Sequence, residues 1–207
     1  MLEIKNTEVF GLDRAILASG NAMTTGEINT SDKSDWVRPE NLVRGYKLGK
    51  APVGSGHDHF LLGIHVQFDI KYPQYWTIEA ERYHNFEIIT SQSKMHRLTS
   101  MGKDWNEFYA MFNEYTELDS IKIAYSLIQK YNDTDEKQYP ELKYTLFMRA
   151  VSSLPMGFEM WMTCDLTYLQ LKTIYHQRKN HKLKEDWGPF CKWCEELPRF
   201  KELIGIP

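Results

Sequence analysis

The chain has 207 residues, of which 42% are hydrophobic and 14% aromatic, so it carries enough apolar material for a core and is not expected to contain long disorder. Its net charge of −3 provides no overall basic field for duplex nucleic acid or an anionic membrane. No window approaches the roughly 18 apolar residues of a spanning helix, and the first residues contain no signal core. With only three cysteines, these features predict a cytoplasmic chain forming a single domain over residues 1–207.

The first quarter of the chain predicts one helix and two loops. Residues 8–18 place apolar side chains at helical spacing, and Gly20 and Asn21 follow as a stop signal. Residues 24–39 are rich in Ser, Thr, Asp and Asn, which is typical of a surface loop. A second loop, residues 49–57, holds three glycines but lacks the Gly-Lys-Ser/Thr ending of a P-loop. Residues 24–56 are therefore predicted to be loop-rich, without a phosphate cradle of that kind.

Residues 61–70 predict a strand with one side that faces solvent or a ligand. Apolar and polar side chains alternate there, with Ile64, Val66, Phe68 and Ile70 against His65, Gln67 and Asp69. After Pro73, residues 74–87 predict a helix, because apolar side chains recur there near one stripe.

The second half of the chain is predicted to be mostly helical. A polar, exposed excursion is expected at residues 132–140, and residues 158–164 fit either a strand or a buried helix. The helical segments are residues 104–115, 120–131, 144–152, 166–176 and 187–197. The whole pattern predicts an α+β fold in which an antiparallel sheet packs with long helices.

Two cysteine and histidine motifs invite interpretations as metal or redox sites. Cys191 and Cys194 form a C-x-x-C, but a zinc site needs two further ligands and a redox pair needs a preceding strand, so both are interpreted as ordinary helix residues. His57 and His59 flank Asp58 on the second loop without a convincing third ligand. No metal site is predicted.

Polar side chains gather in three places that offer binding chemistry. His57, Asp58 and His59 precede the predicted strand; residues 79–84 and 91–97 form a second group; Arg149 and Arg178 form a third. The chain lacks the Gly-x-Ser-x-Gly elbow, the His-Glu-x-x-His zinc helix and the Rossmann glycine fingerprint.

The arrangement of these residues resembles the flavin-dependent thymidylate synthases, over about residues 8–200. In that family a histidine precedes a strand, which is followed by Lys-x-Pro and a helix that ends in Arg-His-Arg. The corresponding residues are His57, Lys71-Tyr72-Pro73 and Arg82-Tyr83-His84, without a gap in spacing. A Ser-x-Ser-Lys-Met-His run beginning at Ser91 is similar to a phage-associated branch of the superfamily.

The chain departs from the family pattern at several of these positions. The central histidine of the signature is Tyr83 and its last arginine is His84, while Glu79 replaces a glutamine. The Ser/Asn/Glu segment is replaced by Ser91-Gln92-Ser93-Lys94. These substitutions lie mainly at positions that face the flavin cofactor in the family.

The resemblance implies a site for a pyrimidine nucleoside monophosphate, with FAD and a reduced folate as cofactors and a homo-oligomer of four chains as the assembly. Arginines suit the phosphate because their planar fork binds it bidentately. The implied nucleotide-binding residues are Glu79, Arg82, Ser91, Gln92, Ser93, Arg97, Arg149 and Arg178. The implied cofactor-binding residues are His57, His59, Tyr83 and His84, and no catalytic residue is assigned.

Three functions remain open at this point. The first is one-carbon transfer to C5 of a deoxyuridylate-type base; the second is a non-catalytic nucleotide binder that has lost flavin chemistry; the third is a partner-binding protein with a vestigial pocket. For Arg82 an ion pair with Glu79 or Glu81 is the competing role, and for Arg178 a contact with the helix dipole. Both nucleotide functions predict that Arg82, Arg178 and residues 91–93 converge on one anion.

Overall fold

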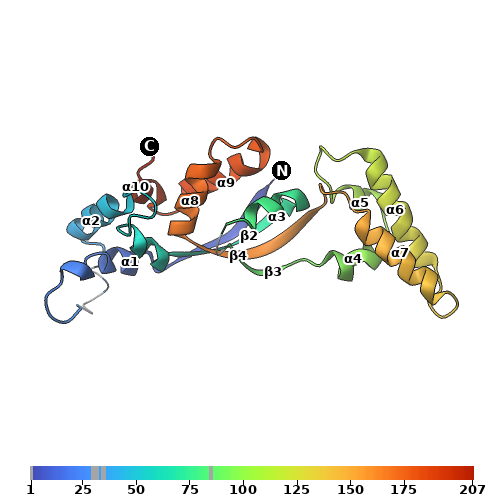
Figure 1. Ribbon diagram of the computed structural model, residues 1–207, viewed down its shortest axis with the longest axis horizontal. Helices are drawn as coiled ribbons and strands as arrows, with labels where there is room; N and C mark the ends of the chain where they lie inside the picture. Colours follow the sequence, from blue (N-terminus) through green and yellow to red (C-terminus); the bar gives the residue numbers. More distant parts are fainter. Residues whose placement is uncertain (1, 29–32, 34–35, 84–85) are drawn as a thin grey trace. The chain divides into compact units, whose positions relative to one another are not determined.

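The computed structural model describes residues 2–28, 33, 36–83 and 86–207. It has the predicted α+β architecture, with helices on an antiparallel sheet of four strands in the order β1-β2-β4-β3 (Figure 1). The strands are β1 (Glu3–Phe10), β2 (His65–Pro73), β3 (Glu87–Ser91) and β4 (Glu159–Thr167). The predicted fold class is confirmed. Among the described residues, no helix is both long and apolar enough to cross a membrane.

The chain forms two compact units, and β2, β3 and β4 each contribute residues to both. One unit comprises residues 71–80 and 90–162, and the other residues 2–70, 81–89 and 163–207.

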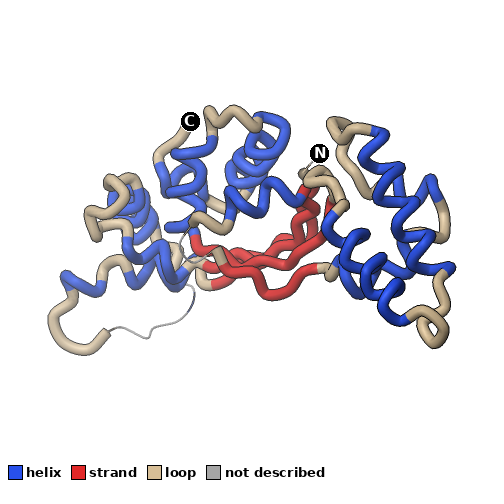
Figure 2. Tube along the Cα trace, turned by 45° about the vertical axis from the view of Figure 1, so that its right-hand side comes forward, coloured by secondary structure: helices blue, strands red, loops and turns tan. Residues whose placement is uncertain are grey.

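The first unit is mainly helical. The two longest helices of this unit, α6 (Leu118–Asp133) and α7 (Pro140–Ser152), lie side by side and are joined by residues 134–139 (Figure 2). Its other helices are α3 (Gln74–Ala80), α4 (Lys94–Met101) and α5 (Trp105–Tyr109). The core includes Leu98, Phe108, Ile121, Ile128, Leu146 and Phe158. Ile121 and Ile128 lie seven residues apart on α6, which is the helical spacing that predicted this element.

The second unit packs helices on one face of the sheet. Phe68 of β2 contacts Phe190 and Trp193 of α9 (Lys184–Glu196), with ring centroids 6.4 and 4.4 Å apart. On the opposite face, Asp69 accepts a hydrogen bond of 2.6 Å from Thr163 of β4. The predicted apolar and polar sides of this strand are confirmed. The remaining elements are α1 (Leu12–Ala18), η1 (Asn21–Met23), α2 (Pro39–Gly49), η3 (His59–Gly63), α8 (Tyr168–Arg178) and α10 (Phe200–Ile204).

Several element boundaries differ from the prediction, and residues 39–49, within the stretch predicted to be loop-rich, form helix α2. Four of the differences have a cause in the structure. The strand predicted over residues 61–70 begins at His65, because residues 59–63 form η3, in which Leu61 is fully buried and the alternation has not yet started. The helix predicted over residues 8–18 begins only at Leu12, because β1 continues to Phe10 and the left-handed Gly11 separates the two elements.

The other two boundaries concern predicted helices that end early. The helix predicted over residues 104–115 ends at Tyr109, because Phe112 forms an isolated antiparallel bridge with Phe158. The helix predicted over residues 74–87 ends at Ala80, and the β-branched residues 88–90 belong to β3 instead. Residues 158–164, for which both structures were open, lie mostly in strand β4.

Candidate functional site

Arg178 and Tyr83 form the main side-chain cluster among the predicted site residues. Nε of Arg178 donates a hydrogen bond of 2.5 Å to the Tyr83 hydroxyl, and the guanidinium lies 5.2 Å from the centroid of that ring. It also lies 4.7 Å from the ring of Trp187, which is fully buried. A planar cation that is hydrogen-bonded to one ring hydroxyl and lies against two aromatic rings is held in a defined orientation. The last turn of α8 therefore presents a fixed positive charge.

The position of Arg178 depends on how α8 begins. Thr167 and Gln170 form a capping box: the Gln170 side chain accepts from the Thr167 backbone N–H at 2.6 Å, and Thr167 Oγ1 accepts from the Gln170 backbone at 3.4 Å. This arrangement satisfies backbone donors that a helix otherwise leaves unpaired. Arg178 follows about three turns later, where a cation is also favoured by the helix dipole.

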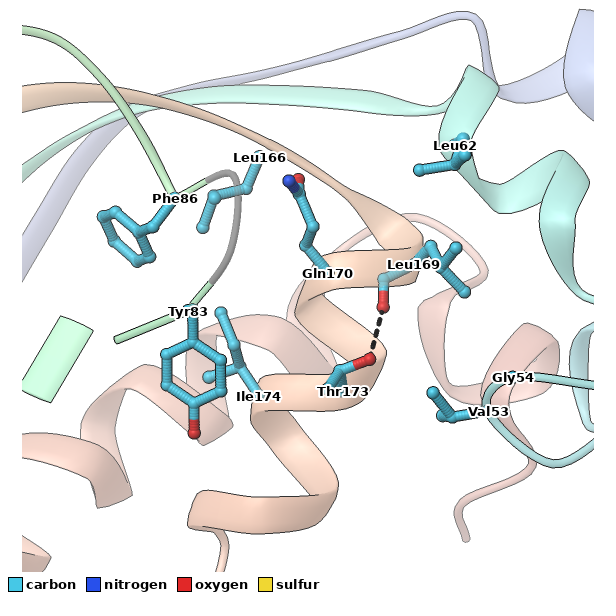
Figure 3. Close-up of a pocket in the computed structure, with 10 residues that line it drawn as sticks. All are labelled: Val53, Gly54, Leu62, Tyr83, Phe86, Leu166, Leu169, Gln170, Thr173 and Ile174. Atoms are coloured by element: carbon cyan, nitrogen blue, oxygen red, sulfur yellow. Dashed lines mark hydrogen bonds between the residues drawn. The ribbon is translucent and has the colours of Figure 1, made fainter. Parts of the chain in front are cut away.

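A pocket of about 360 Å³ lies along α8 and includes Tyr83 in its lining. Figure 3 shows Tyr83 and Phe86 on one side of the α8 side chains, and Val53 and Leu62 on the other. The full lining is Val53, Gly54, Leu62, Tyr83, Phe86, Leu166, Leu169, Gln170, Thr173 and Ile174. Two polar atoms of the lining are already bonded locally, since Thr173 donates to the Leu169 carbonyl at 3.0 Å and Gln170 caps Thr167. The walls therefore suit a flat, largely apolar ring.

A buried ion pair attaches the glycine-rich loop, residues 50–57, to α8. Nζ of Lys172 donates to Asp58 Oδ2 at 2.6 Å and to the carbonyls of Gly49 and Ala51 at 2.8 and 2.5 Å. The Lys172 and Asp58 side chains are only 2% and 3% exposed. All three ammonium protons have acceptors, which is what makes a buried charge tolerable. His57 and His59, on either side of Asp58, are exposed.

Sequence reasoning missed Lys172 and Asp58, although a signal was present. Lys172 lies in the buried stripe of α8 with Tyr168 and Tyr175, at spacings of four and three residues. A charged residue in such a stripe indicates a buried partner. The sequence pattern presents Asp58 only as a companion of the two histidines.

The other predicted cluster lies in the first unit, where β3 leads into α4. Gln92 Oε1 accepts from Arg97 Nη1 at 2.7 Å and from the Trp161 backbone N–H at 3.2 Å, and the Gln92 backbone donates to the Trp161 carbonyl at 2.9 Å. Ser93 caps α4 by accepting from the His96 backbone at 3.3 Å. Gln92 thus orients Arg97 next to a helix N-terminus.

The remaining predicted site residues lie on several different elements. Glu79 is half-buried on α3, Arg82 lies exposed in the turn after it, and Ser91 is the exposed last residue of β3. Arg149 lies exposed in the last turn of α7, and His84 lies outside the described residues. The structure thus pairs Tyr83 with Arg178 and Gln92 with Arg97. The convergence of Arg82, Arg178 and residues 91–93 on one anion stays a prediction.

Burial disfavours the thiolate form of all three cysteines. Cys191 and Cys194 lie within α9, as predicted, and all three free cysteines are buried. Burial raises the pKa of Cys164 to about 12 and that of Cys191 to about 11, and it raises the pKa of Cys194 as well. The reactive thiolate form is therefore scarce. Over the described ranges, no three His, Cys, Asp or Glu side chains are grouped as metal ligands.

Comparison with known proteins gives a match in structure but not in sequence. No protein-family model matches the chain, and no curated protein matches its sequence. A crystal structure of the flavin-dependent thymidylate synthase ThyX from Helicobacter pylori, complexed with FAD and dUMP, matches with a TM-score of 0.69 over 98% of this chain and 97% of that chain. A second ThyX structure from Helicobacter pylori, with FAD and dUMP at 2.31 Å resolution, matches with a TM-score of 0.70 over 99% and 97%.

Both matches have 13% sequence identity, so they show the fold alone. They cover nearly all of this chain, helices and sheet together. The fold implied by the resemblance of a few motifs is confirmed.

Proposed function

We propose that this chain, which has the fold of the flavin-dependent thymidylate synthases, binds a pyrimidine nucleoside monophosphate beside Tyr83. The observation that carries the proposal is the position of Arg178, whose guanidinium is held by the Tyr83 hydroxyl and the Trp187 ring while Tyr83 also lines the pocket. A flat base fits between the apolar walls, and the cation at the Tyr83 hydroxyl is the ligand for a phosphate. One residue, Tyr83, thereby links the two halves of the site.

The second proposed set of phosphate ligands is the Gln92, Ser93 and Arg97 cluster, together with Ser91. A half-buried arginine next to a helix N-terminus is a favourable place for an anion, because the backbone donors and the dipole add to its charge. Glu79, Arg82 and Arg149 stay proposed nucleotide ligands on the resemblance alone.

The fit of FAD is incomplete on the residues described. The two ThyX structures contain FAD and dUMP. In this chain the pocket accepts a flat ring, but Arg178 is already assigned to the nucleotide phosphate, and the described lining residues add no second cation for a diphosphate. Tyr83, where the family signature has histidine, is already bonded to Arg178. The described lining therefore fits the ring of a flavin but supplies no partner for its diphosphate, and His57 and His59 are exposed on a loop.

The non-catalytic binder is therefore the leading function. One-carbon transfer to C5 of a deoxyuridylate-type base, with flavin and a reduced folate, is the second candidate, supported by the extent of the structural match. We also propose a homo-oligomer, on the resemblance to the family.

Calorimetric titration with dUMP and dTMP, with and without FAD, tests the proposal. Wild type is expected to bind a nucleotide without FAD. Since a charge-assisted hydrogen bond contributes about 1.5–3 kcal/mol, Arg178→Ala should weaken binding about tenfold to a hundredfold. Lys179→Ala, an exposed cation next to Arg178, is the matched control and should bind like wild type. Absence of nucleotide binding would refute the proposal, and binding that requires FAD would favour the enzyme.

A further inference from the structure

The glycine-rich loop, residues 50–57, forms part of the Tyr83 pocket but has little packing of its own. Val53 and Gly54 line the pocket, while residues 52–57 are all exposed. Gly54 and Gly56 have φ angles of 86° and 80°, in the left-handed region that glycine adopts freely. An exposed segment with such residues has many alternative conformations when nothing holds it.

Lys172 holds this loop at both ends. Its ammonium binds the carbonyls of Gly49 and Ala51 where the loop begins and the carboxylate of Asp58 where the loop ends. Lys172 belongs to α8, the helix that supplies Leu169, Gln170, Thr173 and Ile174 to the lining of the pocket. One side chain therefore connects the 50–57 loop to helix α8.

We propose that Lys172 and Asp58 are positioning residues, which hold the 50–57 loop as a preformed wall of the Tyr83 pocket and so set its affinity for the ligand without touching it. This inference rests on the proposed function for the identity of the ligand. A preformed wall raises affinity because the loop does not have to be ordered when the ligand binds. Neither residue lines the pocket.

The sharpest variant is the double substitution Lys172→Met with Asp58→Leu. Replacing a buried ion pair by apolar residues of similar volume often leaves a fold as stable as before, whereas Lys172→Met alone leaves an unpaired buried carboxylate. The double variant also removes the two bonds to the loop carbonyls. The double variant therefore tests the attachment of the loop without a large change in the stability of the fold. Lys179→Met, on an exposed position after the same helix, is the control.

Trypsin reports on the loop directly, because Lys50 is exposed and its peptide bond lies between the two clamped carbonyls. Cleavage after Lys50, measured as fragments 1–50 and 51–207, should be about tenfold faster in the double variant, since cleavage requires local opening. The thermal unfolding midpoint should change little. If the double variant is cleaved at the wild-type rate, Lys172 and Asp58 do not hold the 50–57 loop.

The affinity for dUMP tests whether the 50–57 loop acts as a preformed wall of the Tyr83 pocket. The double variant should bind dUMP about tenfold more weakly than wild type, and Lys179→Met should bind equally well. Faster cleavage together with unchanged dUMP affinity would overturn the positioning role. If wild type does not bind dUMP, the proposed function fails, and the wall is then tested with 1-anilinonaphthalene-8-sulfonate, a flat apolar anion. If the double variant binds that dye more weakly than wild type does, the inference is supported. If the two bind it equally well, the inference is refuted.

Discussion

The hydroxyl of Tyr83 accepts a hydrogen bond from Nε of Arg178, and the same tyrosine ring forms a wall of the adjacent pocket. The two residues are 95 positions apart in the sequence. Tyr83 stands at the centre of a signature triplet that has histidine in the family the chain resembles. Its contact with Arg178 couples the orientation of the cation to the shape of the pocket.

Tyr83→Phe should weaken dUMP binding about fivefold, because removing an acceptor from Arg178 costs about 1 kcal/mol while the ring remains. Tyr83→Ala should weaken it more, since the pocket loses a wall as well. Calorimetric titration of the two variants side by side measures the difference. Equal affinity of Tyr83→Phe and wild type would show that the hydroxyl does not position the cation for its ligand.

Arg178→Lys should also bind dUMP more weakly than wild type, by about tenfold, although the charge is retained. A lysine ammonium cannot reproduce the planar fork or its stacking on Tyr83 and Trp187. Calorimetry again provides the measurement, with Lys179→Arg as the control for a charge-conserving change at an exposed position. An Arg178→Lys variant that binds as tightly as wild type would indicate a purely electrostatic role.

Ser93→Ala should lower the free energy of unfolding by about 1 kcal/mol, because Ser93 accepts the hydrogen bond that caps α4. Ser93→Asp retains an acceptor and should be close to wild type in stability. Urea denaturation followed by circular dichroism gives both values. If the alanine and aspartate variants unfold at the same urea concentration, the cap does not stabilise the chain.

Asp69 should make the chain less stable in acid. Hydrogen bonds from Thr163 and then Asn6 lower the pKa of Asp69, against a smaller opposing effect of burial. The unfolded carboxyl, with a pKa of about 3.9, binds a proton at higher pH than the folded one. The stability contributed by ionised Asp69 is therefore present above about pH 3.9 and is lost as the pH falls through the lowered folded pKa.

The variants Asp69→Asn and Thr163→Val test this sign. Both should be less stable than wild type at pH 6, and Asp69→Asn should lose less further stability between pH 5 and pH 3. Urea denaturation at these pH values gives the comparison. An Asp69→Asn variant with the wild-type acid dependence would contradict the assignment.

The assembly prediction is an oligomer rather than a single chain of 24.5 kDa. The prediction is that arginines from different chains meet in one pocket. Such arginines repel one another unless an anion or carboxylates offset their charge, so addition of dUMP should stabilise the assembly. Multi-angle light scattering at micromolar concentration, with and without dUMP, measures the mass. A stable monomer under both conditions would remove this prediction.

Local periodicity made much of the fold predictable. Alternation of apolar and polar side chains located the face of β2 that carries Phe68, and helical spacing located α6 and most of α8. Boundaries were predicted less well where a distant partner decided them, as for Phe112, which leaves the helical pattern to pair with Phe158. The single-domain organisation stays a prediction beside the two compact units.

In the candidate site, Arg178, Arg97 and Tyr83 could be identified from the sequence, because a short motif and its spacing are readable from neighbouring residues. Their partners depend on the tertiary structure, which places Trp187 against Arg178 and Gln92 beside Arg97. The ion pair of Lys172 with Asp58, across 114 residues, likewise depends on it. Spacing along the chain encodes which face of an element is buried. It does not encode which distant side chain meets it there, since that depends on how helices and strands pack.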